Sequence, residues 1–385
     1  MIPYGRQDIS DDDVTAVVDV LRSEFLTQGP AIERFERAVA DYCGARHAVA
    51  VSNATAGLHL ACLAAGLGPG DAHWTSPNTF LASANSGVYC GARPDFVDID
   101  PHTLNMDPAA LADRLAAAAR AGSLPRTLVP VHFGGQSCDM AAIAGLARQH
   151  GVTVIEDASH AIGGRYRGAP VGGCAFSDMT VFSFHPVKIV TTGEGGMVLT
   201  NRDDLCERLR LLRSHGMTRD PARMDGESHG AWYYQQVELG YNYRMTDLQA
   251  ALGTSQMARL DAFVARRHAL ARRYDALLAD LPLEPQRHHP DAFSAFHLYV
   301  VRLRGAEAAQ ARRAVFDALR ARGVGVNVHY IPVHLQPFYR RYGFGEGDFP
   351  EAERYYAEAI TLPLFHGLTE ELQDRVVAAL REVLA

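Results

Sequence analysis

The sequence predicts an α/β protein: a mostly parallel sheet covered by helices on both faces, followed by a smaller α+β domain. Over the first two hundred residues, short apolar segments alternate with segments of helical period, and that alternation is typical of parallel sheets. After about Arg244 the pattern changes to one long helical stretch. The composition, 48% hydrophobic and 21% charged, is ordinary for a globular protein.

The elements of the first part are expected in a regular order. Ser10 with Asp13 predicts a capping box at the start of a helix, whose apolar face would hold Val14, Val17, Val18 and Leu21. Short apolar runs predict strands at 47–52, 95–99, 128–131, 153–156 and 179–184. Between them, helices are expected at 55–65, 108–121 and 140–150.

The second part has a different pattern. A helical stretch over 246–281 precedes a loop at 282–290, a strand at 296–303, a helix at 306–322 and a strand at 324–329. We therefore expect a large domain over 1–250 and a small domain over 251–385.

Bulk properties exclude several classes of protein. A net charge of −7 without a block of lysine and arginine argues against a nucleic-acid-binding face. No apolar run approaches the roughly 18 residues of a membrane span, and the first residues do not resemble a signal peptide. The six cysteines are scattered without a C-x-x-C pair, which indicates reduced thiols in a cytoplasmic protein and no zinc site.

Lys188 is the most informative residue. It follows an apolar strand and precedes the glycine-rich segment 192–196, between Val187 and Ile189. An ammonium in such apolar surroundings is poorly solvated, which favours the neutral amine that attacks carbonyl groups. The alternative is an ordinary loop lysine.

Two further segments favour a bound phosphate cofactor. The turn 52–57 lies where a strand is expected to run into a helix, so its amide groups and Thr55 could hold a phosphate; a simple helix cap is the alternative. Asp157 ends a buried strand, where a carboxylate needs a cation. A protonated pyridine nitrogen of pyridoxal phosphate would supply one. A helix-capping role, or a metal site with His160, is the alternative.

The segments 240–247 and 329–334 also stand out. Thr246 can cap the following helix, which leaves the polar and aromatic residues before it unexplained. His329 and His334, with Pro332 between them, form a poor metal pair.

Together these segments resemble the sugar aminotransferases of the DegT/DnrJ/EryC1/StrS family, pyridoxal-phosphate enzymes of fold type I. The resemblance covers nearly the whole chain and includes the segments 26–29, 75–80 and 213–217. It implies a large cofactor-binding domain, a smaller C-terminal domain and a homodimer with shared active sites.

The resemblance also implies roles for individual residues. Lys188 would carry the cofactor as a Schiff base, Asp157 would pair with the pyridinium nitrogen, and His160 would lie near the phenolic oxygen. Phe80 would stack on the ring. Ala54, Thr55 and Ser183 would hold the phosphate, with Asn242 from the neighbouring subunit. The nucleotide-sugar pocket would be lined by Tyr4, Glu24, Phe25, Leu26, Thr27, Ala54, Ser183, Asn242, Val328, His329, Tyr330 and Ile331.

The expected reaction is transfer of an amino group, with L-glutamate as donor, to the C4 keto group of a UDP-linked 2-acetamido-2,6-dideoxy-4-ketohexose, as in pseudaminic acid biosynthesis. Another 4-keto nucleotide sugar, GDP-linked of the perosamine type or a UDP-linked D-sugar, is the main alternative. Dehydratase relatives carry histidine in place of the lysine, so Lys188 argues against dehydration, although His185 lies nearby.

Two other classes of protein are alternatives to an aminotransferase. A cofactor-binding protein without activity has no need of Lys188 as a base. A Rossmann oxidoreductase would need a G-x-G-x-x-G motif, which does not follow the first strand. Trp74, which departs from the family pattern, either packs in the core or shapes the pocket.

Overall fold

The structure is a computed structural model that describes all residues, 1–385. Its centre is a seven-stranded sheet in the order β1-β9-β8-β5-β4-β2-β3. The strands are β1 (His47–Val51), β2 (Ala72–Thr75), β3 (Arg93–Phe96), β4 (Thr127–Val129), β5 (Thr153–Asp157), β8 (Met179–Ser183) and β9 (Gly196–Thr200). Only β9 is antiparallel to its neighbours, which confirms the mostly parallel sheet.

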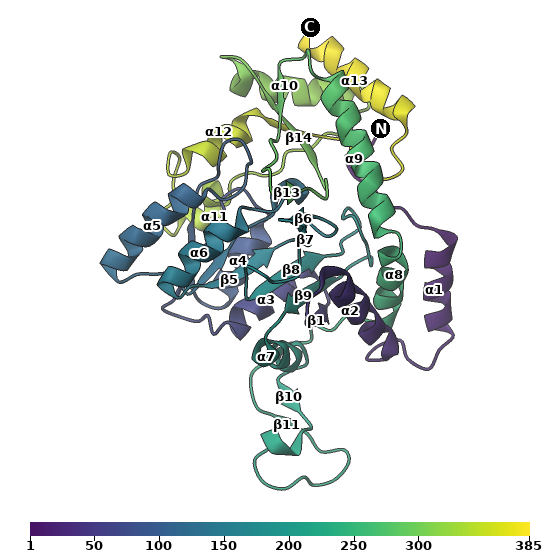
Figure 1. Cartoon of the computed structure of the whole chain (residues 1–385), viewed down its shortest axis with the longest axis vertical. Coiled ribbons are helices and arrows are strands. Elements are labelled where there is room, and N and C mark those ends of the chain that lie inside the picture. The colour runs from purple at the N-terminus through teal and green to yellow at the C-terminus, as the bar shows by residue number, and fades with distance from the viewer.

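Helices cover both faces of this sheet (Figure 1). Alternate residues of the strands enter different cores: Ala48 and Ala50 of β1 pack with α2, whereas Val49 and Val51 pack with α3. The covering helices are α2 (Pro30–Cys43), α3 (Ala54–Ala64), α4 (Leu81–Tyr89), α5 (Pro108–Ala121), α6 (Met140–His150), α7 (Asp203–Arg213) and α8 (Asp247–Met257).

The expected helices at 108–121 and 140–150 are confirmed at both ends. Each begins after an aspartate whose side chain accepts an amide N–H and ends at a glycine in the left-handed conformation, at Gly122 and Gly151. The capping box of Ser10 is also confirmed at the start of α1 (Asp11–Leu21). The expected apolar face of α1 is wrong, because Val14 and Leu21 are more than half exposed.

The second part of the chain forms a three-stranded sheet, β12-β14-β15, with helices around it at the top of Figure 1. Its elements are α9 (Leu260–Leu277), β12 (Leu283–Pro285), β14 (Tyr299–Leu303), α10 (Ala308–Ala321), α11 (Pro337–Arg340), α12 (Pro350–Glu358), β15 (Ala359–Leu362) and α13 (Glu370–Leu384). The expected strand at 324–329 is wrong: this segment makes only single bridges, from Val324 to Ile2 and from Asn327 to Thr361.

The long helical stretch divides into α8 and α9 at Ala258 and Arg259. Helix α9 then joins the two parts of the molecule. Leu260 and Phe263 near its start pack in the core of the large sheet, whereas Tyr274 near its end packs in the core of the small one.

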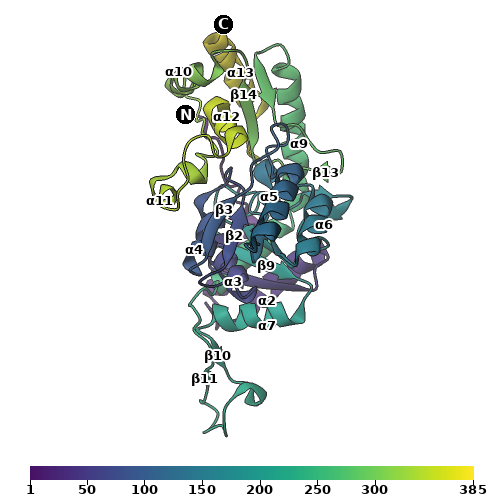
Figure 2. The same ribbon diagram turned by 90° about the vertical axis from the view of Figure 1, so that its left-hand side faces the viewer.

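A narrow arm projects from the body at the bottom of Figures 1 and 2. It consists of β10 (Met217–Thr218), β11 (Gln235–Gln236), the loop between them and a short 3-10 helix, Pro221–Arg223. Other small elements are β6 (Arg165–Tyr166), β7 (Ala169–Pro170), β13 (Ala292–Phe293) and the 3-10 helices Phe133–Gly135 and Val333–Leu335.

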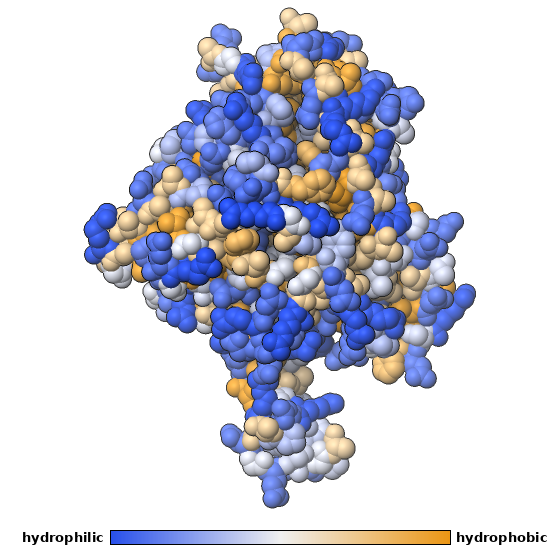
Figure 3. Space-filling model, in the orientation of Figure 1, coloured by the Kyte–Doolittle hydropathy of each residue, from blue (hydrophilic) through white to orange (hydrophobic).

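The face shown in Figure 3 is mainly hydrophilic, with apolar patches scattered over it. No helix combines the length and the apolar character that a bilayer span would require.

Candidate active site

A cavity of about 530 Å³ lies where β5 and β8 end, beside the start of α3 and the segment 327–330. The position agrees with the expectation that ligands bind beyond the carboxyl ends of parallel strands. Among the residues that line it are eleven with expected site roles: Tyr4, Ala54, Thr55, Phe80, Asp157, His160, Ser183, Lys188, Val328, His329 and Tyr330.

The remaining expected site residues do not line this cavity: Glu24, Phe25, Leu26, Thr27, Asn242 and Ile331. Apart from Ile331, they belong to two segments that meet on the surface. Thr27 forms a bridge with Thr246, and the amide of Asp247 donates to the carbonyl of Leu26 at 3.0 Å. Asn242 lies shortly before Thr246 in the sequence. It is exposed and forms an antiparallel bridge with Ser214.

Lys188 lies on the loop after β8, where its amide donates to the carbonyl of His185 at 2.8 Å. Its side chain lines the cavity together with that of Asp157. Burial lowers the pKa of the amine to about 8, and the charge of Asp157 offsets part of that effect. The neutral amine is therefore accessible near physiological pH, as a carbonyl-attacking group requires.

Asp157 is held in one orientation at the end of β5. Its Oδ2 accepts a hydrogen bond of 2.6 Å from the hydroxyl of Ser83, and its Oδ1 accepts one of 3.1 Å from the amide of Ser159. Ser83 is in turn 2.7 Å from the hydroxyl of Thr79. Sequence reasoning missed Ser83, because it comes from α4 and lies in no motif near Asp157.

The start of α3 has backbone amide groups that are free to bind a ligand. The side chain of Asn53 caps the helix by accepting from the amide of Ala56 at 2.8 Å, so the alternative capping role is present as well. The amides of Ala54 and Thr55 have no acceptor within the helix. A Cβ at Gly196 would lie 2.7 Å from the nitrogen of Ala54, so β9 can approach this turn only with glycine there. Ser183 adds a hydroxyl from β8.

Three buried histidines surround the cavity: His160, His297 and His329. Burial lowers the pKa of each of them, and the charge of Lys188 lowers it further. They are therefore neutral near pH 7. His297 was missed by the sequence analysis, although it lies in a run, 294–299, in which polar and aromatic residues precede a strand.

The N–H groups of two of these histidines are used inside the protein. In His160, Nδ1 accepts from the amide of Gly134 at 3.3 Å, and Nε2 lies 3.0 Å from the hydroxyl of Tyr330. In His329, Nε2 lies 3.3 Å from the side-chain amide nitrogen of Asn327, which can only donate, so Nδ1 carries the proton and donates to the hydroxyl of Thr361 at 2.8 Å. No group of three or more histidine, cysteine, aspartate or glutamate side chains is placed to hold a metal ion.

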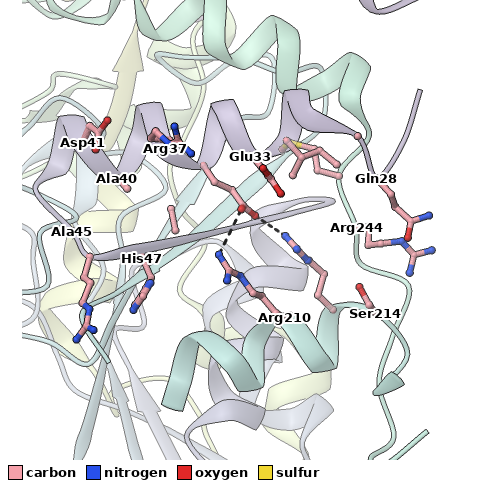
Figure 4. A pocket seen from close by; sticks show the side chains of 17 residues that line it. Gln28, Glu33, Arg37, Ala40, Asp41, Ala45, His47, Arg210, Ser214 and Arg244 are labelled. Carbon is pink, nitrogen blue, oxygen red and sulfur yellow. Dashed lines mark hydrogen bonds and ion pairs between the residues drawn. The ribbon is translucent and has the colours of Figure 1, made fainter. Parts of the chain in front are cut away.

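A second cavity, of about 600 Å³, lies between α2, β1 and the end of α7 and contains none of the expected site residues (Figure 4). Here Glu36 accepts hydrogen bonds from the amide of Ala50 at 2.8 Å and from Arg213 at 2.7 Å. The carbonyl of Arg213 accepts from the amide of Tyr243 at 3.1 Å. This network therefore positions the segment that carries Asn242.

Trp74 does not line the first cavity. It is 4% exposed in a core with α5 and α6, and the guanidinium of Arg114 lies 5.2 Å from its ring centre. The structure therefore places Trp74 as a packing residue.

The residues of the first cavity fit pyridoxal phosphate. Lys188 supplies an amine for the aldehyde, Asp157 a fixed carboxylate for the ring nitrogen, and the start of α3 amide groups for the phosphate. Phe80, more than half exposed at the cavity wall, offers an aromatic face for the ring.

Known proteins match the whole chain. The family model of the DegT/DnrJ/EryC1/StrS aminotransferase family matches residues 7–381. The spore coat polysaccharide biosynthesis protein SpsC of Bacillus subtilis is 41% identical, over 100% of this chain and 97% of its own. The GDP-perosamine synthase of Caulobacter vibrioides is 42% identical, over 92% and 91%.

Solved structures agree with these sequence matches. A sugar aminotransferase of Streptococcus pneumoniae, Spr1654 in its PMP form, superposes with a TM-score of 0.91 at 30% identity, over 100% of this chain and 99% of its own. Helicobacter pylori PseC, an aminotransferase of pseudaminic acid biosynthesis, superposes with a TM-score of 0.90 at 29% identity, over 100% and 99%. The chain therefore belongs to the DegT/DnrJ/EryC1/StrS family of pyridoxal-phosphate-dependent sugar aminotransferases.

Proposed function

We propose that this enzyme transfers the amino group of L-glutamate to the C4 keto group of a UDP-linked 2-acetamido-2,6-dideoxy-4-ketohexose, in pseudaminic acid biosynthesis. The observation that carries the transfer of an amino group is the amine of Lys188 beside the fixed carboxylate of Asp157 in one cavity. The likeness to PseC supports the choice of sugar.

A GDP-linked keto sugar is the second candidate. The perosamine synthase of Caulobacter vibrioides is 42% identical to this chain, whereas PseC is 29% identical. Both products would be amines at C4 of a nucleotide sugar, so either substrate would bind in the same cavity. The two substrates differ in the nucleotide, and their products differ in the configuration at C4.

Five residues of the cavity have a task in this reaction. When bound, the cofactor supplies an electron sink for the bonds at the carbon that exchanges its amine. Asp157 keeps a proton on the ring nitrogen, while Ala54, Thr55 and Ser183 hold the phosphate. Lys188, once free, moves a proton at the Cα of the donor, since its lowered pKa suits an amine that acts as a base near pH 8.

We further propose a homodimer in which each subunit completes the site of the other. The charged residues that line the cavity are Asp157, Lys188 and Glu194, so one chain supplies a single lysine for a phosphate and a nucleotide diphosphate. The segment of Leu26 and Thr27 and the segment of Asn242 adjoin on the surface, outside the cavity. A second copy that presents this joined patch would supply the missing contacts.

The six cysteines are all free and buried, which supports a cytoplasmic location.

The substrate is tested by incubating the enzyme with L-glutamate and a panel of UDP- and GDP-linked 4-keto sugars, followed by NMR assignment of the product at C4. Amination of the UDP-linked 2-acetamido sugar at the highest kcat/KM supports the proposal. A preference for a GDP-linked sugar supports the second candidate instead.

A further inference from the structure

The hydroxyl of Tyr330 is presented to the cavity by a fixed chain of hydrogen bonds. The amide of Gly134 can only donate, so Nδ1 of His160, at 3.3 Å, accepts and carries no proton. His160 is neutral, because burial and Lys188 lower its pKa well below the usual value. Its single proton is therefore on Nε2, which donates to the oxygen of Tyr330 at 3.0 Å.

This assignment leaves the proton of Tyr330 free. The phenol oxygen accepts from His160, and no other group of the chain accepts from it. Burial raises the pKa of Tyr330, as do the charges of Asp157 and Tyr4, so the phenol remains protonated. Tyr330 lines the cavity together with Lys188 and Asp157. It therefore offers a neutral hydrogen-bond donor in the same cavity as the amine.

The proposed reaction needs such a donor. When an amine attacks a keto group, negative charge develops on the keto oxygen, and a fixed donor at that oxygen lowers the barrier. Asp157 and Glu194 can only accept when ionised, and the N–H groups of His160 and His329 are engaged within the protein. Tyr4 and His297 also line the cavity and carry donors, but the hydroxyl of Tyr330 is the one that a histidine holds in place.

We infer that Tyr330 donates a hydrogen bond to the keto oxygen of the acceptor sugar and that His160 orients it. The inference rests on the proposed function. It makes Tyr330 a catalytic residue and His160 a positioning residue that acts through Tyr330.

The first test measures the tautomer of His160 and needs no substrate. In the purified holoenzyme labelled with ¹⁵N-histidine, the His160 signals are assigned by their loss in His160→Gln. We expect a protonated Nε2 and a bare Nδ1. A proton on Nδ1, or on both nitrogens, overturns the inference.

The second test separates the two halves of the reaction by stopped-flow absorbance. In Tyr330→Phe, the half reaction with L-glutamate, followed as the loss of the visible band that precedes release of the keto acid, should stay within about twofold of wild type, whereas the half reaction with the UDP-linked keto sugar should slow by about 100-fold. The matched control is Tyr274→Phe, a buried tyrosine of α9 whose hydroxyl donates to the carbonyl of Pro363 at 3.0 Å. It should leave both halves unchanged. Equal slowing of both halves in Tyr330→Phe, or of neither, overturns the inference.

The third test asks whether His160 acts through Tyr330. His160→Leu should slow the keto-sugar half reaction, and His160→Gln, which can still donate an N–H, should restore most of that rate. The double variant with Tyr330→Phe should be no slower than Tyr330→Phe alone, because coupled residues are not additive. Additive losses contradict the positioning role. If wild type aminates no keto sugar while the tautomer is as expected, the proposed function fails and the hydrogen-bond chain stands.

Discussion

Ser83 donates a hydrogen bond of 2.6 Å to Oδ2 of Asp157, although the two residues are separated by 74 positions in the chain. Because Asp157 also accepts from the amide of Ser159, both of its oxygens are held, and the carboxylate has one orientation toward the cavity. The first prediction concerns this bond.

Ser83→Ala should lower kcat/KM by about 10- to 100-fold, since a hydrogen bond to a charged group contributes roughly 1.5–3 kcal/mol. The same variant should weaken cofactor retention in an equilibrium titration. The control is Ser86→Ala in the same helix, whose hydroxyl donates to the carbonyl of Ser83 and does not touch Asp157. If both variants lose the same activity, the effect is a general loss of packing around α4.

The second prediction is a pH profile. Burial lowers the pKa of Lys188 from 10.5 to about 8, so in the cofactor-free protein the neutral amine increases as pH rises through about 8. The rate at which added pyridoxal phosphate forms its visible band should increase with the same midpoint. Because Asp157 raises this pKa, Asp157→Asn should move the midpoint to lower pH. A midpoint near 10.5 would show that the amine is fully solvated.

The third prediction concerns the ion pair of the buried Glu36 and the partly buried Arg213. Arg213→Leu leaves the carboxylate of Glu36 with only the more distant Arg210 as a cation and should reduce the free energy of unfolding by about 3 kcal/mol. Arg210→Leu is the control, since Arg210 is half exposed and 4.0 Å from Glu36. Denaturant unfolding should separate the two variants clearly. Equal stability would mean that this pair does not hold the segment before Asn242.

Whether a helix or strand can be predicted from the sequence depends on whether the residues that determine it lie close to it in the chain. The helices at 108–121 and 140–150 were predicted to the residue because their caps lie beside them in the chain. The expected strand at 324–329 failed because strand pairing depends on partners far away, and here only Ile2 and Thr361 are within reach. The division of the helical stretch at Ala258 left no local signal such as proline or glycine.

The same distinction applies to the site. Lys188 and Asp157 follow apolar strands, so their place at the sheet edge could be predicted from pattern alone. Ser83 and His297 could not, because each is defined by a neighbour that only the folded chain brings near. The separation of Asn242 from the cavity also becomes visible only in the structure.

The fourth prediction tests the shared site. Lys188→Ala and Asn242→Ala should each be inactive or strongly impaired, and dimers mixed from both variants should regain part of the activity. In such a dimer, one of the two sites receives an intact lysine from one chain and an intact Asn242 from the other. Dimer exchange should be checked by native mass spectrometry. Mixed dimers without recovered activity would contradict the shared site.

The most direct test of an aminotransferase centred on Lys188 is the visible spectrum of the purified holoenzyme during one turnover. We predict an absorbance band of the lysine-bound cofactor that disappears on addition of L-glutamate and returns on addition of the UDP-linked 4-keto sugar. The same cycle should be lost in Lys188→Ala. A holoenzyme whose band does not respond to L-glutamate, or a full cycle in Lys188→Ala, would contradict the account.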